Sequence, residues 1–306
     1  MVYHEIRIVN GQKMNYLINN QREDRRWKKT AKFIGAGKLD EEEVRKLKKE
    51  FEIELKLNKK YKYLQKKKVL DVEKLVKGYD EGIKKLSKEE FIRFEKSFFT
   101  ELTYNSNAIE GNSLSLEETS IVINEGLSPE GKTLREVYEA KNHMKALELI
   151  RNYKGVLNEQ FILKIHSIIL NDISERFAGK YRENPVRVIG SDFHFPSPEK
   201  IPQLMGNLIY WYNKNKKNMH PLELAIIFSM KFVSIHPFID GNGRVSRLIM
   251  NFILQKKRYP WINIYNKQRQ KYLKAVRKAN NEDYSEIINF LIEVIKENMK
   301  DFGFLE

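Results

Sequence analysis

The chain has 306 residues, no cysteine and a formal net charge of +15 at pH 7. Disulfide bonds and thiolate zinc sites are therefore excluded, and the N-terminus lacks the basic-then-apolar pattern of a secretory signal. The longest apolar runs are interrupted and too short to span a bilayer, so we expect a cytoplasmic protein with no membrane partner.

Most of the positive charge lies in the first third of the chain. Residues 1–100 contain 27 Lys and Arg against 17 Asp and Glu. Two runs of β-forming residues, 3–8 and 14–18, flank the dipeptide Asn10-Gly11. This dipeptide between two such runs predicts a β-hairpin.

A helix is predicted next. Asp40 and Glu43 indicate its start, and its apolar stripe consists of Val44, Leu47, Phe51 and Leu55. We expect residues 1–86 to form a small basic accessory region of a β-hairpin and helices. Three interpretations of its charge stay open: a solvated helix pair, a surface for an acidic target protein, or a surface for nucleic acid.

From residue 87 onward the pattern is helical. Ser87 with Glu90 and Ser115 with Glu118 have the spacing of capping boxes. The expected later helices cover 134–153, 158–169, 198–212, 221–235 and 287–295. We expect residues 87–306 to form one domain, so the fold class is mainly α. A short β-hairpin is predicted amid these helices, because β-branched residues alternate before a turn at Gly190.

The stretch 236–247, HPFIDGNGRVSR, concentrates the polar chemistry of the chain. Gly241 and Gly243 allow a tight turn whose N–H groups point inward to bind an anion. The apolar residues that follow predict a helix, so this nest lies at a helix N-terminus, where phosphate is favoured. Arg244 and Arg247 are one turn apart and can fork onto phosphate oxygens.

Two further residues of this stretch suit phosphate chemistry. Asp240 is placed to hold a Mg²⁺ ion that also bridges phosphate oxygens. His236, with an ordinary pKa near ~6.5, can accept a hydroxyl proton at neutral pH. The stretch therefore predicts a polyphosphate site with a general base.

The same stretch matches the pattern H-x-F-x-(D/E)-G-N-G-R-x-x-R at every constrained position, and the chain resembles the Fic family. The resemblance implies a Fic-type helical bundle that transfers AMP from ATP to a Ser, Thr or Tyr hydroxyl of a protein. It implies His236 as the base, Asp240 as the ligand of Mg²⁺ (or Mn²⁺), and Phe238 as the core anchor of the loop. The residues implied to bind the nucleotide phosphates are Gly241, Asn242, Gly243, Arg244 and Arg247.

The resemblance extends to two other regions. The predicted hairpin corresponds to the family's flap, which pins the backbone of the target protein, here through Val188, Ile189 and Gly190. Family geometry also places a Tyr and an Asn from the region after the signature near the adenosine. Tyr272 and Asn280 are the candidates.

A third segment, Ser106 to Gly111, matches the family's inhibitory pattern (S/T)-x-x-x-E-(G/N). Glu110 would pair with Arg247 and so occupy the guanidinium that binds the γ-phosphate. The alternative is a plain helix end capped by Gly111. In the class with an inhibitory helix N-terminal to the signature, the same glutamate also positions water to remove AMP.

Several functions stay open. The first is an ATP-dependent protein adenylyltransferase restrained by Glu110. The second is a non-catalytic nucleotide-binding module, against which His236 argues, because a pure binding pocket needs no base. A Fic transferase with another donor such as UTP is the third. The expected partners are ATP and a protein target, and a nucleic-acid partner and a homo-oligomer stay open.

Overall fold

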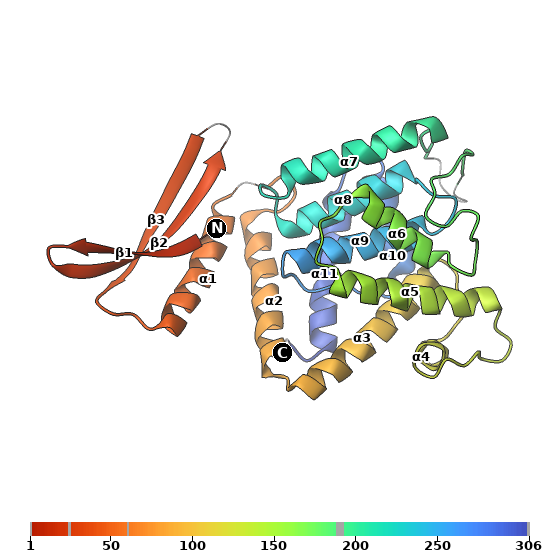
Figure 1. The fold of residues 1–306 in the computed structure, drawn as a ribbon, viewed down its shortest axis with the longest axis horizontal. Helices are drawn as coiled ribbons and strands as arrows, with labels where there is room; N and C mark the ends of the chain where they lie inside the picture. Colours follow the sequence, from red (N-terminus) through yellow and green to blue (C-terminus); the bar gives the residue numbers. More distant parts are fainter. Residues whose placement is uncertain (1, 24–25, 60, 188–192, 305–306) are drawn as a thin grey trace. The chain divides into compact units, whose positions relative to one another are not determined.

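A computed structural model of the chain describes residues 2–23, 26–59, 61–187 and 193–304. The chain forms two compact units, Met1–Lys74 and Leu75–Glu306. Figure 1 shows the chain coloured from the N-terminus to the C-terminus.

The first unit contains a three-stranded antiparallel sheet in the order β1-β2-β3. Its strands are β1 Val2–Val9, β2 Gln12–Glu23 and β3 Arg26–Ala36. Asn10 and Gly11 both have positive φ between β1 and β2, so the expected hairpin is confirmed. The third strand was not predicted, because lysines interrupt the apolar pattern of β3 and hide its alternation.

One helix covers one face of this sheet. Helix α1 (Glu41–Leu57) begins at Asp40, whose side chain accepts a hydrogen bond from the Glu42 N–H. The core of the unit consists of Val2, Leu17 and Phe51, with Ile34, Leu47 and Leu55 packed against it. The expected apolar stripe of this helix therefore forms the core contact. Helix α2 (Lys66–Lys85) follows.

The second unit is helical, which confirms the expected fold class. Its helices are α3 Lys88–Ile109, α4 Leu116–Asn124, α5 Leu134–Asn152, α6 Glu159–Ile169, α7 Ile201–Asn215, α8 Pro221–Ile235, α9 Asn242–Lys256, α10 Arg269–Ala279 and α11 Ser285–Asp301, with short 3-10 turns at Pro198–Lys200 and Asn266–Gln268. Capping boxes start three of them, at Ser87, Ser115 and Thr133. The centre of the unit is the pair α8 and α9, which α5, α6, α7 and α11 surround (Figure 1).

The contacts divide the chain inside α2, whereas the sequence predicts a boundary after Leu86. The reason is the C-terminal part of α2. The ring of Tyr79 lies 5.8 Å from the ring of Phe304, and Phe304 also lies over Gly82. The last turns of α2 therefore pack within the second unit.

Within the described residues, no helix is both long enough and apolar enough to cross a bilayer.

Candidate active site

The loop between α8 and α9 carries the signature residues. His236 ends α8 in the left-handed conformation, with φ of 50°, and its N–H donates to the Phe232 carbonyl at 3.0 Å. Gly241, with φ of 79°, precedes the first residue of α9. The two positive φ angles turn the chain at each end of the loop, so its backbone approaches the N-terminus of α9.

The rings of Phe238 and His166 pack beneath the backbone of this loop, on the side of the protein core. Phe238 is fully buried, and its ring stacks on His166 with centroids 3.6 Å apart. The Nδ1 of His166 accepts a hydrogen bond from the Gly179 N–H at 3.0 Å, so its Nε2 donates to the Asp240 carbonyl at 3.1 Å. This arrangement requires a neutral imidazole, and burial lowers the pKa of His166 to about 4. The expected core anchoring by Phe238 is therefore observed, and His166 braces the loop with it.

Arg182 also holds this loop through hydrogen bonds, and the sequence analysis did not predict this role. The side chain is buried, and its Nε donates to the His236 carbonyl at 2.8 Å. The other two guanidinium nitrogens donate to the carbonyls of Asn184 at 2.9 Å and Pro196 at 2.6 Å. One guanidinium thus ties the start of the signature loop to both ends of the 184–196 segment.

Replacing Arg182 by Ala should lower the free energy of unfolding by about 3–5 kcal/mol, because three hydrogen bonds from one buried, charged donor are lost. For a domain of this size, that is a fall in Tm of roughly 6–20 °C. Thermal unfolding followed by circular dichroism measures the change. Arg182→Lys keeps the charge but not the fork, so an intermediate Tm is expected. An unchanged Tm in Arg182→Ala would contradict this role.

Asn242 lies at the start of α9, and its side chain is fully used by the loop. Its Oδ1 accepts from the Phe238 N–H at 3.0 Å, and its Nδ2 donates to the Phe238 carbonyl at 2.8 Å. The sequence predicted that this side chain helps to cradle phosphates. Both of its polar atoms bond the Phe238 backbone here, and its contact with phosphate stays a prediction, as does that of the backbone N–H groups in the first turn of α9.

Arg247 meets the predicted inhibitory segment at the end of α3. Its guanidinium is buried and lies 2.7 Å from the Glu110 carboxylate. It also donates to the Ser106 hydroxyl at 3.0 Å and to the Ser106 carbonyl at 2.7 Å. The predicted contact between Glu110 and Arg247 is therefore present, and Ser106 forms part of it.

Glu110 also reaches the N-terminus of α9. A Cβ atom added at Gly243 would lie 2.1 Å from the Glu110 Oε1, so a side chain there would displace this carboxylate. Gly111 follows with φ of 102°, which a glycine adopts without strain. The carboxylate thus lies where a helix N-terminus favours an anion.

Asp240 and Arg244 belong to a network that the sequence did not predict. Each Asp240 oxygen meets an arginine: Oδ2 lies 2.6 Å from Arg135, and Oδ1 lies 3.2 Å from Arg244. Glu139 pairs with Arg244 at 3.0 Å and accepts a bond from the Asn112 amide at 2.9 Å. Burial acts against ionisation of Asp240, but Arg244, the adjacent backbone N–H and Arg135 outweigh it and lower the pKa of the carboxyl.

Arg244, whose expected contact with the phosphates stays a prediction, is held by these two carboxylates. It is buried beneath the loop between Glu139 and Asp240, whereas Arg247 lines the cavity described next. Arg244 reaches back to Asp240, which lies in the loop before α9, so the one-turn spacing of the two arginines does not give them a common direction.

The remaining site residues line a cavity of about 270 Å³. Its lining includes His236, Asp240, the Gly241–Gly243 backbone, Arg247 and Glu110. Tyr272 and Asn280 line it as well, as the sequence predicted for an adenosine pocket, together with Val276 and Arg277 from α10. The structure therefore brings residues from α3, α8, α9 and α10 to one cavity.

The imidazole of His236 is suited to accept a proton in this cavity. Burial lowers its pKa to about 4, and the charge of Arg182 acts in the same direction. The Phe195 ring lies 4.3 Å from it. The side chain is therefore neutral at pH 7 and can take a proton from a hydroxyl group brought next to it.

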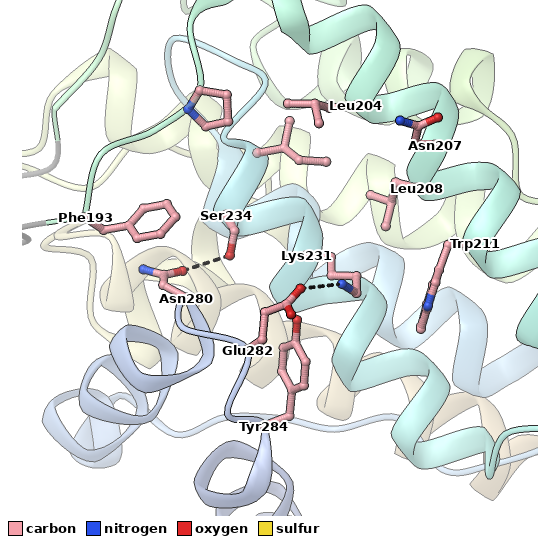
Figure 2. Close-up of a pocket in the computed structure, with 12 residues that line it drawn as sticks. Phe193, Leu204, Asn207, Leu208, Trp211, Lys231, Ser234, Asn280, Glu282 and Tyr284 are labelled. Carbon is pink, nitrogen blue, oxygen red and sulfur yellow. Dashed lines mark hydrogen bonds and ion pairs between the residues drawn. The ribbon is translucent and has the colours of Figure 1, made fainter. Parts of the chain in front are cut away.

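A second cavity of about 450 Å³ lies beside the first, and Asn280 lines both. Figure 2 shows Leu204, Leu208 and Trp211 of α7 along one side and Tyr284 on the other. The Ser234 hydroxyl donates to Asn280 at 3.0 Å, so this hydrogen bond fixes the amide between the two cavities. Ser234, which lines the second cavity, therefore orients the Asn280 side chain.

Comparison with known proteins agrees with this geometry. Residues 156–254 match the model of the Fic/DOC family. The chain contains a Fic/DOC family domain. A protein adenylyltransferase Fic of Drosophila mojavensis is 31% identical over 216 residues, 68% of this chain and 42% of the relative. One of Nematostella vectensis is 33% identical over 201 residues, 64% of this chain and 47% of the relative.

A solved structure shares the fold of the Fic domain. It is the crystal structure of a Fic domain containing signaling protein from Bacteroides thetaiotaomicron, with a TM-score of 0.69 and 28% identity. The match covers 75% of this chain and 94% of that chain. The chain spans less than half of the length of the curated relatives it matches.

Asp240 is the metal ligand that the sequence predicts, and this role stays a prediction. Among the described residues, no group of three or more His, Asp and Glu side chains is arranged to hold a metal ion. A single carboxylate at a cavity edge instead fits Mg²⁺ that arrives on a nucleotide, because Mg²⁺ takes one or two carboxylates and the phosphates themselves.

The predicted flap residues Val188, Ile189 and Gly190 lie outside the described residues, and their described flanks at 185–187 and 193–197 are not in strands.

A buried histidine makes the stability of the Fic domain sensitive to acid. His143 is buried, with its Nδ1 3.0 Å from the Thr103 hydroxyl, and burial, reinforced by Arg247 and Arg244, lowers its pKa well below the ordinary value. The unfolded chain therefore binds a proton that the folded chain does not as pH falls below ~6.5. The contribution of His143 to stability is complete above that pH and should fall below it by about 1.4 kcal/mol per pH unit, in addition to the losses from His166 and His236, whose pKa values are lowered too. Urea unfolding between pH 7 and 5 tests this: His143→Gln should show a shallower loss than the wild type, and equal slopes would contradict it.

Proposed function

We propose that this chain is a protein adenylyltransferase. It transfers AMP from ATP to a Ser, Thr or Tyr hydroxyl of a protein, itself included. The observation that carries the proposal is a neutral, half-buried His236 in one cavity with Arg247 and the N-terminus of α9. A base and an anion-binding helix end are the two parts that an attack on a phosphate requires. The names of the curated relatives support the same reaction.

The proposed step uses residues of the cavity only. His236 takes the proton of the acceptor hydroxyl as its oxygen attacks the α-phosphorus of ATP. The bond between the α-phosphorus and the bridging oxygen breaks, and pyrophosphate leaves. Arg247 and the N–H groups at the start of α9 hold the phosphates in line for this attack. Asp240 would hold Mg²⁺ (or Mn²⁺), which neutralises phosphate charge when bound.

Glu110 restrains this reaction in our proposal. Its carboxylate pairs with the guanidinium that would bind the γ-phosphate and covers the Gly243 backbone. ATP must therefore displace the carboxylate or bind with its phosphates misplaced. In our proposal the same carboxylate also activates water, which would remove AMP from a modified protein.

ATP labelled at two positions distinguishes this reaction from the alternatives. A Glu110→Gly protein is incubated with Mg²⁺ and ATP labelled on either the α- or the γ-phosphate, and the protein is then counted. Transfer of the α-label alone is expected. Transfer of the γ-label alone would show phosphate transfer. Neither label would indicate a non-catalytic nucleotide module, and the same assay with α-labelled UTP tests the other donor.

A further inference from the structure

The N-terminal sheet has one face that α1 does not cover. The side chains of a strand alternate between its two faces. Val2, Leu17 and Ile34 therefore face α1, and the strand pairing places their neighbours on the opposite side. We call this opposite side the open face. Its aromatic and basic members are Tyr3, Arg7, Tyr16, Trp27, Lys29 and Phe33.

Aromatic rings are unusually exposed on the open face. The exposed fraction is 72% for Trp27, 52% for Phe33 and 39% for Tyr3. Four of the thirteen large hydrophobic side chains that are exposed in the described part of the chain lie on this face: Tyr3, Val9, Trp27 and Phe33. A monomeric protein rarely exposes apolar side chains in such a group without a partner for them.

Cations lie among these rings. The Arg7 guanidinium is 4.4 Å from the centroid of the Tyr16 ring, and the Phe33 ring packs against Tyr16 at 5.4 Å. Lys29 stands on the same face with half of its side chain exposed, and Glu5 pairs with both Lys29 and Arg7. Residues 1–38 carry nine Lys and Arg against three Asp and Glu. The sheet as a whole therefore attracts a polyanion.

We propose that the open face binds single-stranded nucleic acid. Exposed rings offer stacking surfaces for unpaired bases, and the surplus of Lys and Arg offers counter-charges for the phosphates between them. A duplex does not suit the face, because its bases are already stacked on each other. An acidic protein would be attracted by the charge but would leave Trp27 and Phe33 without a matching surface. The inference is independent of the Fic domain's reaction.

Fluorescence anisotropy with the full chain tests this proposal. The probes are fluorescein-labelled oligouridine and oligothymidine of about 20 nucleotides, a duplex of the same length, and labelled poly-glutamate. We expect binding of the single strands that weakens with salt, and a loss of affinity of about tenfold in Trp27→Ala and in Phe33→Ala. Tyr210 is a matched control, since it is 68% exposed on α7, and Tyr210→Ala should bind as the wild type does.

The outcomes separate the alternatives. Loss of affinity in the two sheet variants but not in Tyr210→Ala supports the proposal, and the tighter single strand shows whether RNA or DNA is preferred. Absence of binding at low salt would overturn it. Equal affinity for poly-glutamate, unaffected by either substitution, would also overturn it and indicate an acidic protein as the partner. Circular dichroism confirms that each variant is folded.

Discussion

His236→Ala is expected to reduce AMP transfer by about 10²- to 10⁴-fold, the usual contribution of a positioned general base. Its imidazole is neutral because burial lowers its pKa to about 4. Nucleotide affinity should change little, because Arg247 and the start of α9 remain in place. Isothermal titration with ATP measures binding, and transfer of α-labelled AMP measures the reaction.

The matched control for this substitution is His194, an exposed histidine that does not line the cavity. His194→Ala should retain the rate of transfer. If His236→Ala kept the wild-type rate at equal nucleotide affinity, another residue would have to be the base.

Glu110→Gly is expected to raise auto-modification at least about tenfold, which is within the range of coupling between a regulatory contact and a ligand site. The substitution removes the carboxylate that lies 2.7 Å from Arg247. The initial rate with α-labelled ATP measures the effect. Glu125→Gly is a matched control, because Glu125 is an exposed C-cap residue of α4 just as Glu110 is the C-cap of α3.

A double-mutant cycle decides whether the effect acts through Arg247. In an Arg247→Ala background, which itself weakens nucleotide binding, the state of Glu110 should no longer matter. An equal gain from Glu110→Gly with and without Arg247 would contradict the proposed restraint.

Local sequence signals predicted much of this molecule. The capping boxes at Ser87 and Ser115 gave the starts of two helices correctly, since both partners of a box lie within four residues. The Asn10-Gly11 turn gave the first hairpin. The contact between Glu110 and Arg247 joins residues far apart in the chain, and it was predicted from two motifs of one family rather than from local patterns.

The errors concern long-range contacts that leave no periodic signal. Arg182 looks like a loop residue, because its three carbonyl partners lie in segments that only the fold brings together. The pairing of Arg244 with Glu139 on α5 was not predicted, because the two residues have no sequence relation. Strand β3 was missed, because four of its residues are Arg or Lys. These residues depend on tertiary contacts, so their roles became visible only in the structure.

Intact mass after incubation with ATP and Mg²⁺ tests the central claim most directly. The three proteins are the wild type, Glu110→Gly, and Glu110→Gly combined with His236→Ala. The account predicts a gain of one or more AMP in Glu110→Gly, less in the wild type and none in the combined variant. No gain in Glu110→Gly, or an equal gain in the combined variant, would contradict it.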